Sequence, residues 1–191
     1  MIKNIIIDFP IIEVRDLGRR PSSATDVSAL IHLIEEYSTN DILEIGTWYG
    51  KTTYELASAF PNKIVYTIDY MEDDLILSEH GTKTRAKKED LCKYAKDLDN
   101  VVFIYENSHT YDFYQLGYID FIFIDGNHSF DGVKKDSEKS IDYLRGNNGG
   151  IIAWHDIHNK GLTDVPRYLN CLAKEIDINY IKGTNIGFTI V

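Results

Sequence analysis

Three things are scarce in this sequence: cysteine, long apolar runs and positive charge. The two cysteines, Cys92 and Cys171, are far apart and give no disulfide framework, so we expect a reducing, cytoplasmic location. No apolar run approaches the roughly 20 residues that span a bilayer, and the N-terminus is too acidic for a signal peptide. The net charge of −10 argues against broad binding to nucleic acid, which needs a basic face.

The length and composition fit one globular domain. We assign the domain to residues 1–191, with residues 1–21 as an N-terminal extension. Folding at this length buries about 70% of the surface of the unfolded chain, so neither a disulfide nor a metal is needed for stability. No repeat, low-complexity tract or interdomain linker interrupts the sequence, which supports a single domain.

Strand-like and helix-like stretches alternate along the chain, which is typical of a parallel sheet with crossover helices. Short apolar runs predict strands at 42–46, 64–69, 101–105, 120–125, 150–154, 177–181 and 186–191. Amphipathic stretches predict helices at about 24–38, 50–60, 82–98, 131–145 and 162–174. The central runs are continuously apolar, which predicts helices on both faces of the sheet. Residues 182–185 have room only for a tight turn, so we expect an α/β, Rossmann-like, seven-stranded, mostly parallel sheet with an antiparallel C-terminal hairpin.

The stretch 42–57, ILEIGTWYGKTTYELA, combines a buried strand, a glycine-containing turn and an amphipathic helix. Gly46 permits a sharp turn close to a ligand, and Gly50 lets the helix begin near it, so that free backbone N–H groups face the ligand. Asp69 ends the next strand, 23 residues after Gly46, where an acid typically holds ribose hydroxyls. These residues predict a nucleotide-type ligand.

Two ligands fit this turn: S-adenosylmethionine and a nucleoside triphosphate. The segment GTWYGKT is similar to a phosphate-binding P-loop, and the strand that ends at Asp125 is similar to the acidic strand that accompanies one. Only three residues separate Gly46 from Gly50, whereas a P-loop needs four at this place. Glu44, just before the turn, suits the positive amine of methionine better than a triphosphate, so we favour S-adenosylmethionine.

The chain resembles the class I S-adenosylmethionine-dependent methyltransferases, and more narrowly the macrocin O-methyltransferase and cephalosporin hydroxylase-like group. The resemblance runs from about residue 22 to 191 and rests on the segments ILEIGTWYGKTT, YTIDY, FIFIDGNHSFDGVKKD, GGIIAWHDI and KGTNIGFTIV. Many of these methyltransferases have a third glycine in the turn, where this chain has Trp48.

The resemblance implies roles for the residues that match. The implied cofactor-binding set is Glu44, Gly46, Thr47, Trp48, Gly50, Asp69, Asn107, Ser108 and Asp125. Within it, the turn and the acid before it would line the methionine part of the cofactor. Asp69 would hold the ribose, and Asn107 and Ser108 would lie at the adenine edge.

Acids and histidines follow two neighbouring predicted strands. Asp125 ends one strand and His155 and Asp156 end the next, so these side chains should meet at one edge of a parallel sheet. Carboxylates beside an imidazole suit a divalent cation such as Mg²⁺, although imidazole is an uncommon Mg²⁺ ligand. In related methyltransferases, an ion at these strand ends lowers the pKa of a substrate hydroxyl. We therefore predict a metal site of Asp125, His155 and Asp156.

His128 lies in the loop after Asp125 and has two interpretations. Histidine titrates near neutral pH, so His128 is a candidate general base on the acceptor hydroxyl, with Asp125 and Asp156 completing the catalytic set. The alternative is a loop histidine that only bonds the backbone or caps a helix.

We predict an enzyme that transfers a methyl group from S-adenosylmethionine to a hydroxyl of a small molecule, such as a sugar or natural product, with or without a divalent metal. The alternatives are a P-loop-like nucleoside triphosphatase, a metal-dependent hydrolase or hydroxylase-like enzyme on the same fold, and a binding module without catalysis. The expected partner is a small-molecule acceptor rather than nucleic acid or a membrane. The acceptor, O- against N-methylation and assembly into a homo-oligomer stay open.

Overall fold

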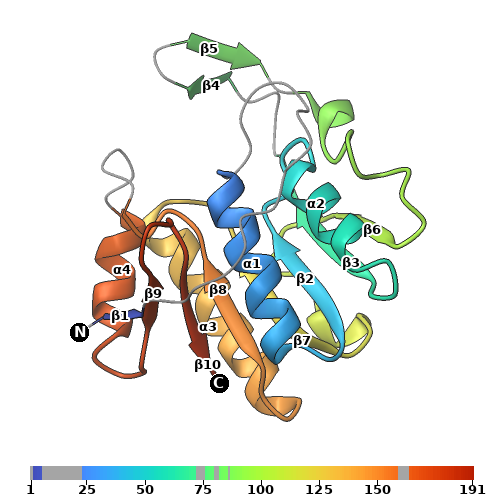
Figure 1. The fold of residues 1–191 in the computed structure, drawn as a ribbon. Helices are drawn as coiled ribbons and strands as arrows, with labels where there is room; N and C mark the ends of the chain where they lie inside the picture. Colours follow the sequence, from blue (N-terminus) through green and yellow to red (C-terminus); the bar gives the residue numbers. More distant parts are fainter. Residues whose placement is uncertain (1, 6–22, 72–75, 80–81, 86, 159–163) are drawn as a thin grey trace.

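The computed structural model describes residues 2–5, 23–71, 76–79, 82–85, 87–158 and 164–191 (Figure 1). Most of the N-terminal extension, residues 6–21, lies outside these ranges. The main sheet has the strand order β1-β9-β10-β8-β7-β2-β3-β6. Its strands are β1 (Lys3–Ile5), β2 (Asp41–Ile45), β3 (Val65–Asp69), β6 (Val101–Tyr105), β7 (Ile119–Ile124), β8 (Ile151–Trp154), β9 (Asn179–Ile181) and β10 (Gly187–Ile190).

The pairing of the strands confirms the predicted fold class. Strands β6, β3, β2, β7 and β8 run parallel to one another, and β10 lies antiparallel between β8 and β9. All seven predicted strands are present, with ends within two residues of those expected. An eighth strand, β1, comes from the predicted extension and pairs parallel with β9 at the edge of the sheet.

Within the described ranges, the strands are connected by four α-helices: α1 (Ala24–Tyr37), α2 (Lys51–Ala59), α3 (Phe130–Gly146) and α4 (Asp164–Leu172). Ser23 caps α1 through a capping box, in which its side chain accepts from the Asp26 N–H and the Asp26 side chain accepts from the Ser23 N–H. The Ser129 hydroxyl caps α3 by accepting from the Gly132 N–H. No helix in the described ranges is apolar over a length that would cross a membrane.

The helices cover both faces of the sheet (Figure 1). Strand β7 shows why its sequence is continuously apolar: Phe121 and Phe123 pack with α1 and α2 on one face, while Ile122 and Ile124 pack with α3 and α4 on the other. All four side chains are buried. The predicted burial of the central strands on both faces is therefore confirmed.

The helix predicted at 82–98 is wrong. Residues Thr82–Arg85 form β5, which pairs with β4 (Ile76–Glu79) in a separate two-stranded antiparallel sheet, and a short 3₁₀ helix, Lys88–Asp90, follows. Beyond it, the Cys92 N–H donates to the Trp48 carbonyl at 2.8 Å. Cys92 also has a φ of 56°, which breaks an α-helix. Hydrogen bonds to the turn after β2 thus replace the local helical pairing that the amphipathic pattern favours.

Candidate active site

The candidate site lies at the carboxyl ends of the parallel strands, on either side of β2. From β2 the chain continues to β3 and β6 on one side, while β7 and β8 lie on the other. A parallel α/β sheet binds ligands at such a point, where the strand order reverses direction. The predicted site residues lie near the ends of β2 and β3 or follow β2, β6, β7 and β8, so the topology brings them to one edge of the sheet.

The glycine turn, residues 46–50, requires both of its glycines. Gly46 has a φ of 98°, and a Cβ there would lie 2.2 Å from the carbonyl oxygen of Asp125. Gly50 has a φ of 76°, and a Cβ there would lie 3.0 Å from the Cα of Cys92. Side chains rarely adopt such φ values, and neither position has space for one. The close approach of Gly46 places the glycine turn directly against the residue that ends β7.

Asp69 organises the glycine turn from the end of β3. Its Oδ2 accepts from the backbone N–H groups of Thr47 (3.1 Å) and Trp48 (2.7 Å), and its Oδ1 accepts from the Tyr70 N–H (2.8 Å). Burial raises the pKa of Asp69, and these three hydrogen bonds oppose the rise. The carboxylate therefore shapes the turn itself, and contact with a ribose stays a prediction. The Trp48 side chain packs against a small apolar cluster around Met71.

Glu44 lies beneath the glycine turn rather than on its surface. Its side chain is buried, and its Oε2 accepts from the hydroxyls of Thr53 and Thr67, the second at 2.6 Å. The Thr67 hydroxyl in turn lies 2.6 Å from that of Thr47 in the turn. Burial raises the pKa of Glu44 to about 8 despite the two hydroxyl donors. Direct contact between Glu44 and a cofactor stays a prediction.

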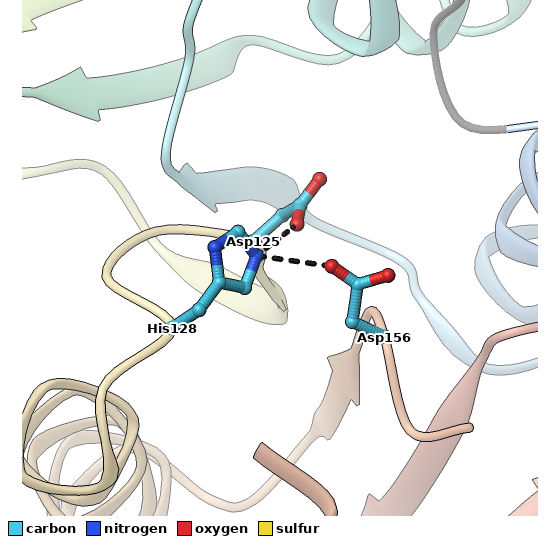
Figure 2. Close-up of side chains that lie close together, drawn as sticks. All are labelled: Asp125, His128 and Asp156. Atoms are coloured by element: carbon cyan, nitrogen blue, oxygen red, sulfur yellow. Dashed lines mark hydrogen bonds and ion pairs between the residues drawn. The ribbon is translucent and has the colours of Figure 1, made fainter. Parts of the chain in front are cut away.

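Asp125, His128 and Asp156 converge beside the glycine turn and form what we call the acid–histidine cluster (Figure 2). The Nε2 of His128 lies 3.2 Å from Asp125 Oδ1 and 3.1 Å from Asp156 Oδ2. One ligand atom from each residue lies within 4.8 Å of the other two, which is a spacing that can hold a metal ion. Burial lowers the pKa of His128, but hydrogen bonds to the two carboxylates outweigh it and raise the pKa to about 9.

His155 approaches the same carboxylates from another side. Its Nδ1 lies 3.3 Å from Asp125 Oδ1 and 3.4 Å from Asp156 Oδ1, and its Nε2 lies 3.4 Å from Asp26 Oδ2. Burial lowers the pKa of His155, but the charge of Asp125 and these hydrogen bonds raise it to about 12. Both ring nitrogens of His155 therefore face carboxylates, whereas the group whose atoms converge closely enough to hold an ion consists of Asp125, His128 and Asp156. Ligation by His155 stays a prediction.

Sequence reasoning missed Asp26 as a site residue. Its carboxylate is buried in the first turn of α1, contacts His155, and accepts from the Asn185 N–H at 2.7 Å. An acid three residues after a serine at a helix start is fully explained by a capping box. No pattern in the sequence therefore separates a capping acid from an acid that also contacts a site residue.

A family model described as a methyltransferase domain matches residues 43–157. The chain belongs to this methyltransferase family. The matched span begins in β2 and ends just after Asp156, so it contains both the glycine turn and the acid–histidine cluster. The predicted methyltransferase identity is thereby confirmed.

Solved structures share the fold of this methyltransferase. A candidate caffeoyl-CoA O-methyltransferase from Staphylococcus aureus is 20% identical with a TM-score of 0.62, covering 95% of this chain and 85% of that one. The Podospora anserina methyltransferase PaMTH1, bound to S-adenosylhomocysteine (SAH), is 19% identical with a TM-score of 0.61, covering 89% and 79%. MycE of the mycinamycin pathway, in complex with Mg, SAH and mycinamycin VI, is 16% identical with a TM-score of 0.53, covering 83% and 46%. No curated protein matches the chain by sequence. Identities this low establish the fold alone.

The methyltransferase places Asn107 and Ser108 in a turn after β6 that folds toward α3. The Asn107 side chain accepts from the His109 N–H at 2.9 Å, and the Ser108 hydroxyl donates to Asp136 Oδ1 at 2.7 Å. Burial raises the pKa of Asp136, while Ser108, His109 and Lys139 oppose the rise. The turn that is predicted to contact adenine is thus fixed through Ser108 by Asp136, a buried acid that sequence analysis did not single out.

The P-loop alternative finds no support in the site of this methyltransferase. A P-loop lysine extends toward the phosphates of its nucleotide. Here Lys51 begins α2 with only 5% of its surface exposed, and its ammonium lies 5.4 Å from the ring centroid of Tyr94. The lysine is therefore part of the packing around α2, and the nucleoside triphosphatase alternative is not favoured.

Proposed function

We propose that this methyltransferase transfers a methyl group from S-adenosylmethionine to a hydroxyl oxygen of a small molecule, such as a sugar or natural product. The observation that carries the proposal is the position of the acid–histidine cluster directly beside the glycine turn. A hydroxyl at this place would meet a base and two carboxylates next to the methyl donor. PaMTH1 contains SAH, and MycE contains SAH, Mg and a natural product, which supports the same chemistry here.

The cofactor would lie along the carboxyl edge of β2 and β3. S-adenosylmethionine supplies an activated methyl group on a sulfonium. The glycine turn offers the close backbone approach that such a ligand needs, and Asp69 fixes the conformation of the turn through the Thr47 and Trp48 N–H groups. The chain's task is to align the acceptor oxygen with the methyl carbon and the sulfur, since alignment removes much of the entropic barrier.

The donor set of the acid–histidine cluster fits a divalent cation. Asp125 and Asp156 would hold it, because carboxylate oxygens suit Mg²⁺ better than imidazole does. Such a cation would supply a positive charge that lowers the pKa of the acceptor hydroxyl and of the neighbouring His128. We assign proton removal to His128 Nε2, which stands between the two carboxylates.

His155 is assigned a positioning role. It contacts both carboxylates through Nδ1 and is anchored by Asp26 through Nε2. The side chains of Asp125 and Asp156 are therefore held from two sides, by His128 and by His155. Metal ligation by His155, a homo-oligomeric state and a cytoplasmic location remain predictions, the last supported by two free cysteines, Cys92 and Cys171.

Calorimetry with S-adenosylmethionine, SAH and ATP, each with and without Mg²⁺, tests the proposal. Saturable binding of the first two ligands without ATP binding is expected. Binding of ATP alone would overturn the methyltransferase proposal and direct attention to Lys51 and Asp125.

Two substitutions test the division of roles. Asp69→Ala should weaken SAH binding because the glycine turn loses the acceptor for two of its N–H groups. Asp156→Ala should leave SAH binding within about threefold and lower turnover by about a hundredfold or more, as expected for loss of a group that acts on the acceptor proton. The assignment fails if Asp156→Ala abolishes cofactor binding and Asp69→Ala does not.

A further inference from the structure

Strand β6 forms one outer edge of the main sheet, and its sequence is apolar from end to end. The strand order places β6 beyond β3, with no strand of the described ranges on its other side. Its sequence, VVFIY, contains no charge, glycine or proline. None of these side chains is fully buried, and 41% of the surface of Val102 is exposed. An open strand edge of this kind pairs readily with another chain, which is why proteins usually shorten such edges or place charges on them.

The opposite edge of the sheet is protected in both of these ways. Strand β1, at that edge, has only 3 residues, compared with 5 in β6. Its first residue, Lys3, is exposed, and its ammonium lies 2.8 Å from Asp177. The sheet therefore ends in a short strand with a charge on one side and in a longer apolar strand on the other. This difference points to β6 as the edge that accepts a partner strand.

The hydrogen bonds between β3 and β6 show which backbone groups of β6 face outward. The Val65 N–H of β3 donates to the Asn100 carbonyl at 2.9 Å, so every second residue from Asn100 onward bonds β3. The residues between them, which include Phe103 and Tyr105, direct their N–H and C=O groups away from the sheet. No backbone group from another part of the described chain bonds these groups of Phe103 and Tyr105. They are therefore available to a partner strand.

Two copies of β6 fit each other in an antiparallel register centred on Phe103. In that register, Phe103 lies opposite Phe103 of the partner subunit, and Val101 lies opposite Tyr105 of the partner subunit. All of these positions have outward-facing backbone groups, so the opposed residues can exchange N–H···O bonds. The Val101 N–H already donates to the Leu98 carbonyl at 3.1 Å, so Val101 would take part through its carbonyl alone.

The charges beside β6 are compatible with the same register. Each chain has a net charge of −10, so two copies repel one another unless the surfaces that meet are uncharged. The nearest acids are Asp99 before the strand and Glu106 after it, and both are exposed. In the register centred on Phe103, Glu106 lies opposite Asn100 of the partner subunit, and Asp99 lies opposite Asn107 of the partner subunit. No acid therefore faces an acid across the contact.

We propose that two copies of this chain pair through β6, antiparallel about a twofold axis at Phe103, so that their main sheets join into one continuous sheet. Cross-strand contacts between apolar side chains, such as Val102 with Ile104 of the partner subunit, add to the backbone bonds. The contact uses the same edge on both copies and leaves only the protected β1 edges open, so association stops at the dimer. This inference goes beyond the proposed function and does not depend on it.

Sedimentation equilibrium measures the association, and Val102→Glu tests the surface. The mass of the wild type should rise with concentration toward twice the 21.9 kDa of one chain. Val102→Glu should weaken the dimer at least about tenfold, because it places an acid against Ile104 and close to Glu106 of the partner subunit. Ile190→Glu, at a strand residue that is 60% exposed, adds the same charge away from β6 and should leave the affinity unchanged.

Amide hydrogen exchange, measured at single residues of the wild type, tests whether β6 itself forms the contact. The Phe103 N–H faces outward, so it should be protected at concentrations that give the dimer and should exchange rapidly after dilution to the monomer. The Ile104 N–H bonds β3, so it should stay protected in both states. This comparison needs no variant and therefore holds even if Val102→Glu does not fold.

Three results would overturn the proposal. The first is a dissociation constant of the wild type weaker than about 100 μM. The second is a folded Val102→Glu variant that dimerises as tightly as the wild type. The third is a dimer in which the Phe103 N–H exchanges as fast as in the monomer. Either of the last two would place the contact on another face. None of them bears on the binding of S-adenosylmethionine or SAH, which tests the proposed function separately.

Discussion

Replacement of Glu44 by glutamine should change how the stability of the protein depends on pH. Burial raises the pKa of Glu44 to about 8 from an ordinary 4.5, and the nearby Asp69 and Asp125 add to the rise. Between these two pH values the folded state keeps a proton that the unfolded state releases. The stabilisation of the folded state by this retained proton is therefore complete below pH 4.5 and is lost as the pH rises toward 8.

The magnitude follows from the two pKa values. Between pH 5.5 and pH 7.5 this single group should lower the free energy of unfolding of the wild type by about 2–3 kcal/mol, at 1.36 kcal/mol per pKa unit. A glutamine at this position does not titrate, and its side-chain oxygen can still accept from Thr53 and Thr67. The free energy of unfolding of the Glu44→Gln variant should therefore gain about 2–3 kcal/mol relative to that of the wild type over this range.

Urea unfolding followed by circular dichroism at pH 5.5, 6.5 and 7.5 measures the effect. With a slope of about 2 kcal/mol per M urea, the difference between the two midpoints should change by about 1 M. Glu36→Gln, on the exposed part of α1, is the control. Its free energy of unfolding should change with pH in parallel with that of the wild type. Parallel curves for Glu44→Gln as well would refute the reasoning, because they would mean that Glu44 is ionised in the folded protein.

Three further substitutions test the framework around the site by urea unfolding at pH 7. Gly46→Ala should cost about 1–3 kcal/mol or more, because the new Cβ meets the Asp125 carbonyl at a φ of 98°; a midpoint unchanged from the wild type would contradict this. Ser137→Ala should cost about 1–2 kcal/mol by leaving the buried Trp154 Nε1 without its acceptor at 2.9 Å, and Trp154→Phe should reduce that cost. Asp120→Asn should cost about 2 kcal/mol, since Oδ2 accepts from two backbone N–H groups. Hydrogen bonds hold the pKa of Asp120 low against burial, so the last penalty should shrink as the pH falls below 4.

The strands were predictable because their signal is local. Phe121 to Ile124 are apolar without interruption, and that pattern alone indicates burial on both faces. The meeting of Asp125 and Asp156 was predictable for a related reason, since the carboxyl ends of parallel strands share one edge. Which histidine nitrogen faces which carboxylate depends on turn geometry, so His128 and His155 could be placed near the cluster but not oriented.

The errors and omissions share a different cause. Residues 82–98 have helical periodicity, yet Cys92 bonds the glycine turn, a partner 44 positions earlier at Trp48 that no local pattern reveals. Asp26 and Asp136 were missed because each lies at an ordinary helical position. Their partners, His155 and Ser108, are 129 and 28 residues away in sequence. A buried polar pair of this kind is set by the packed structure rather than by periodicity.

The contacts of Asp26 have a consequence for the order in which the protein can mature during synthesis. Its carboxylate bonds His155, 129 residues later, and the backbone of Asn185, 159 residues later. Translation proceeds at about 5–20 residues per second, so α1 emerges many seconds before either partner exists. A nascent chain that stops before Asn185 holds every group of the acid–histidine cluster, but Asp26, which contacts His155, lacks its bond from the Asn185 N–H. Asp26 and His155 can therefore reach their final arrangement only after residue 185 has been synthesised, and chains that stop before it should lack this support of His155.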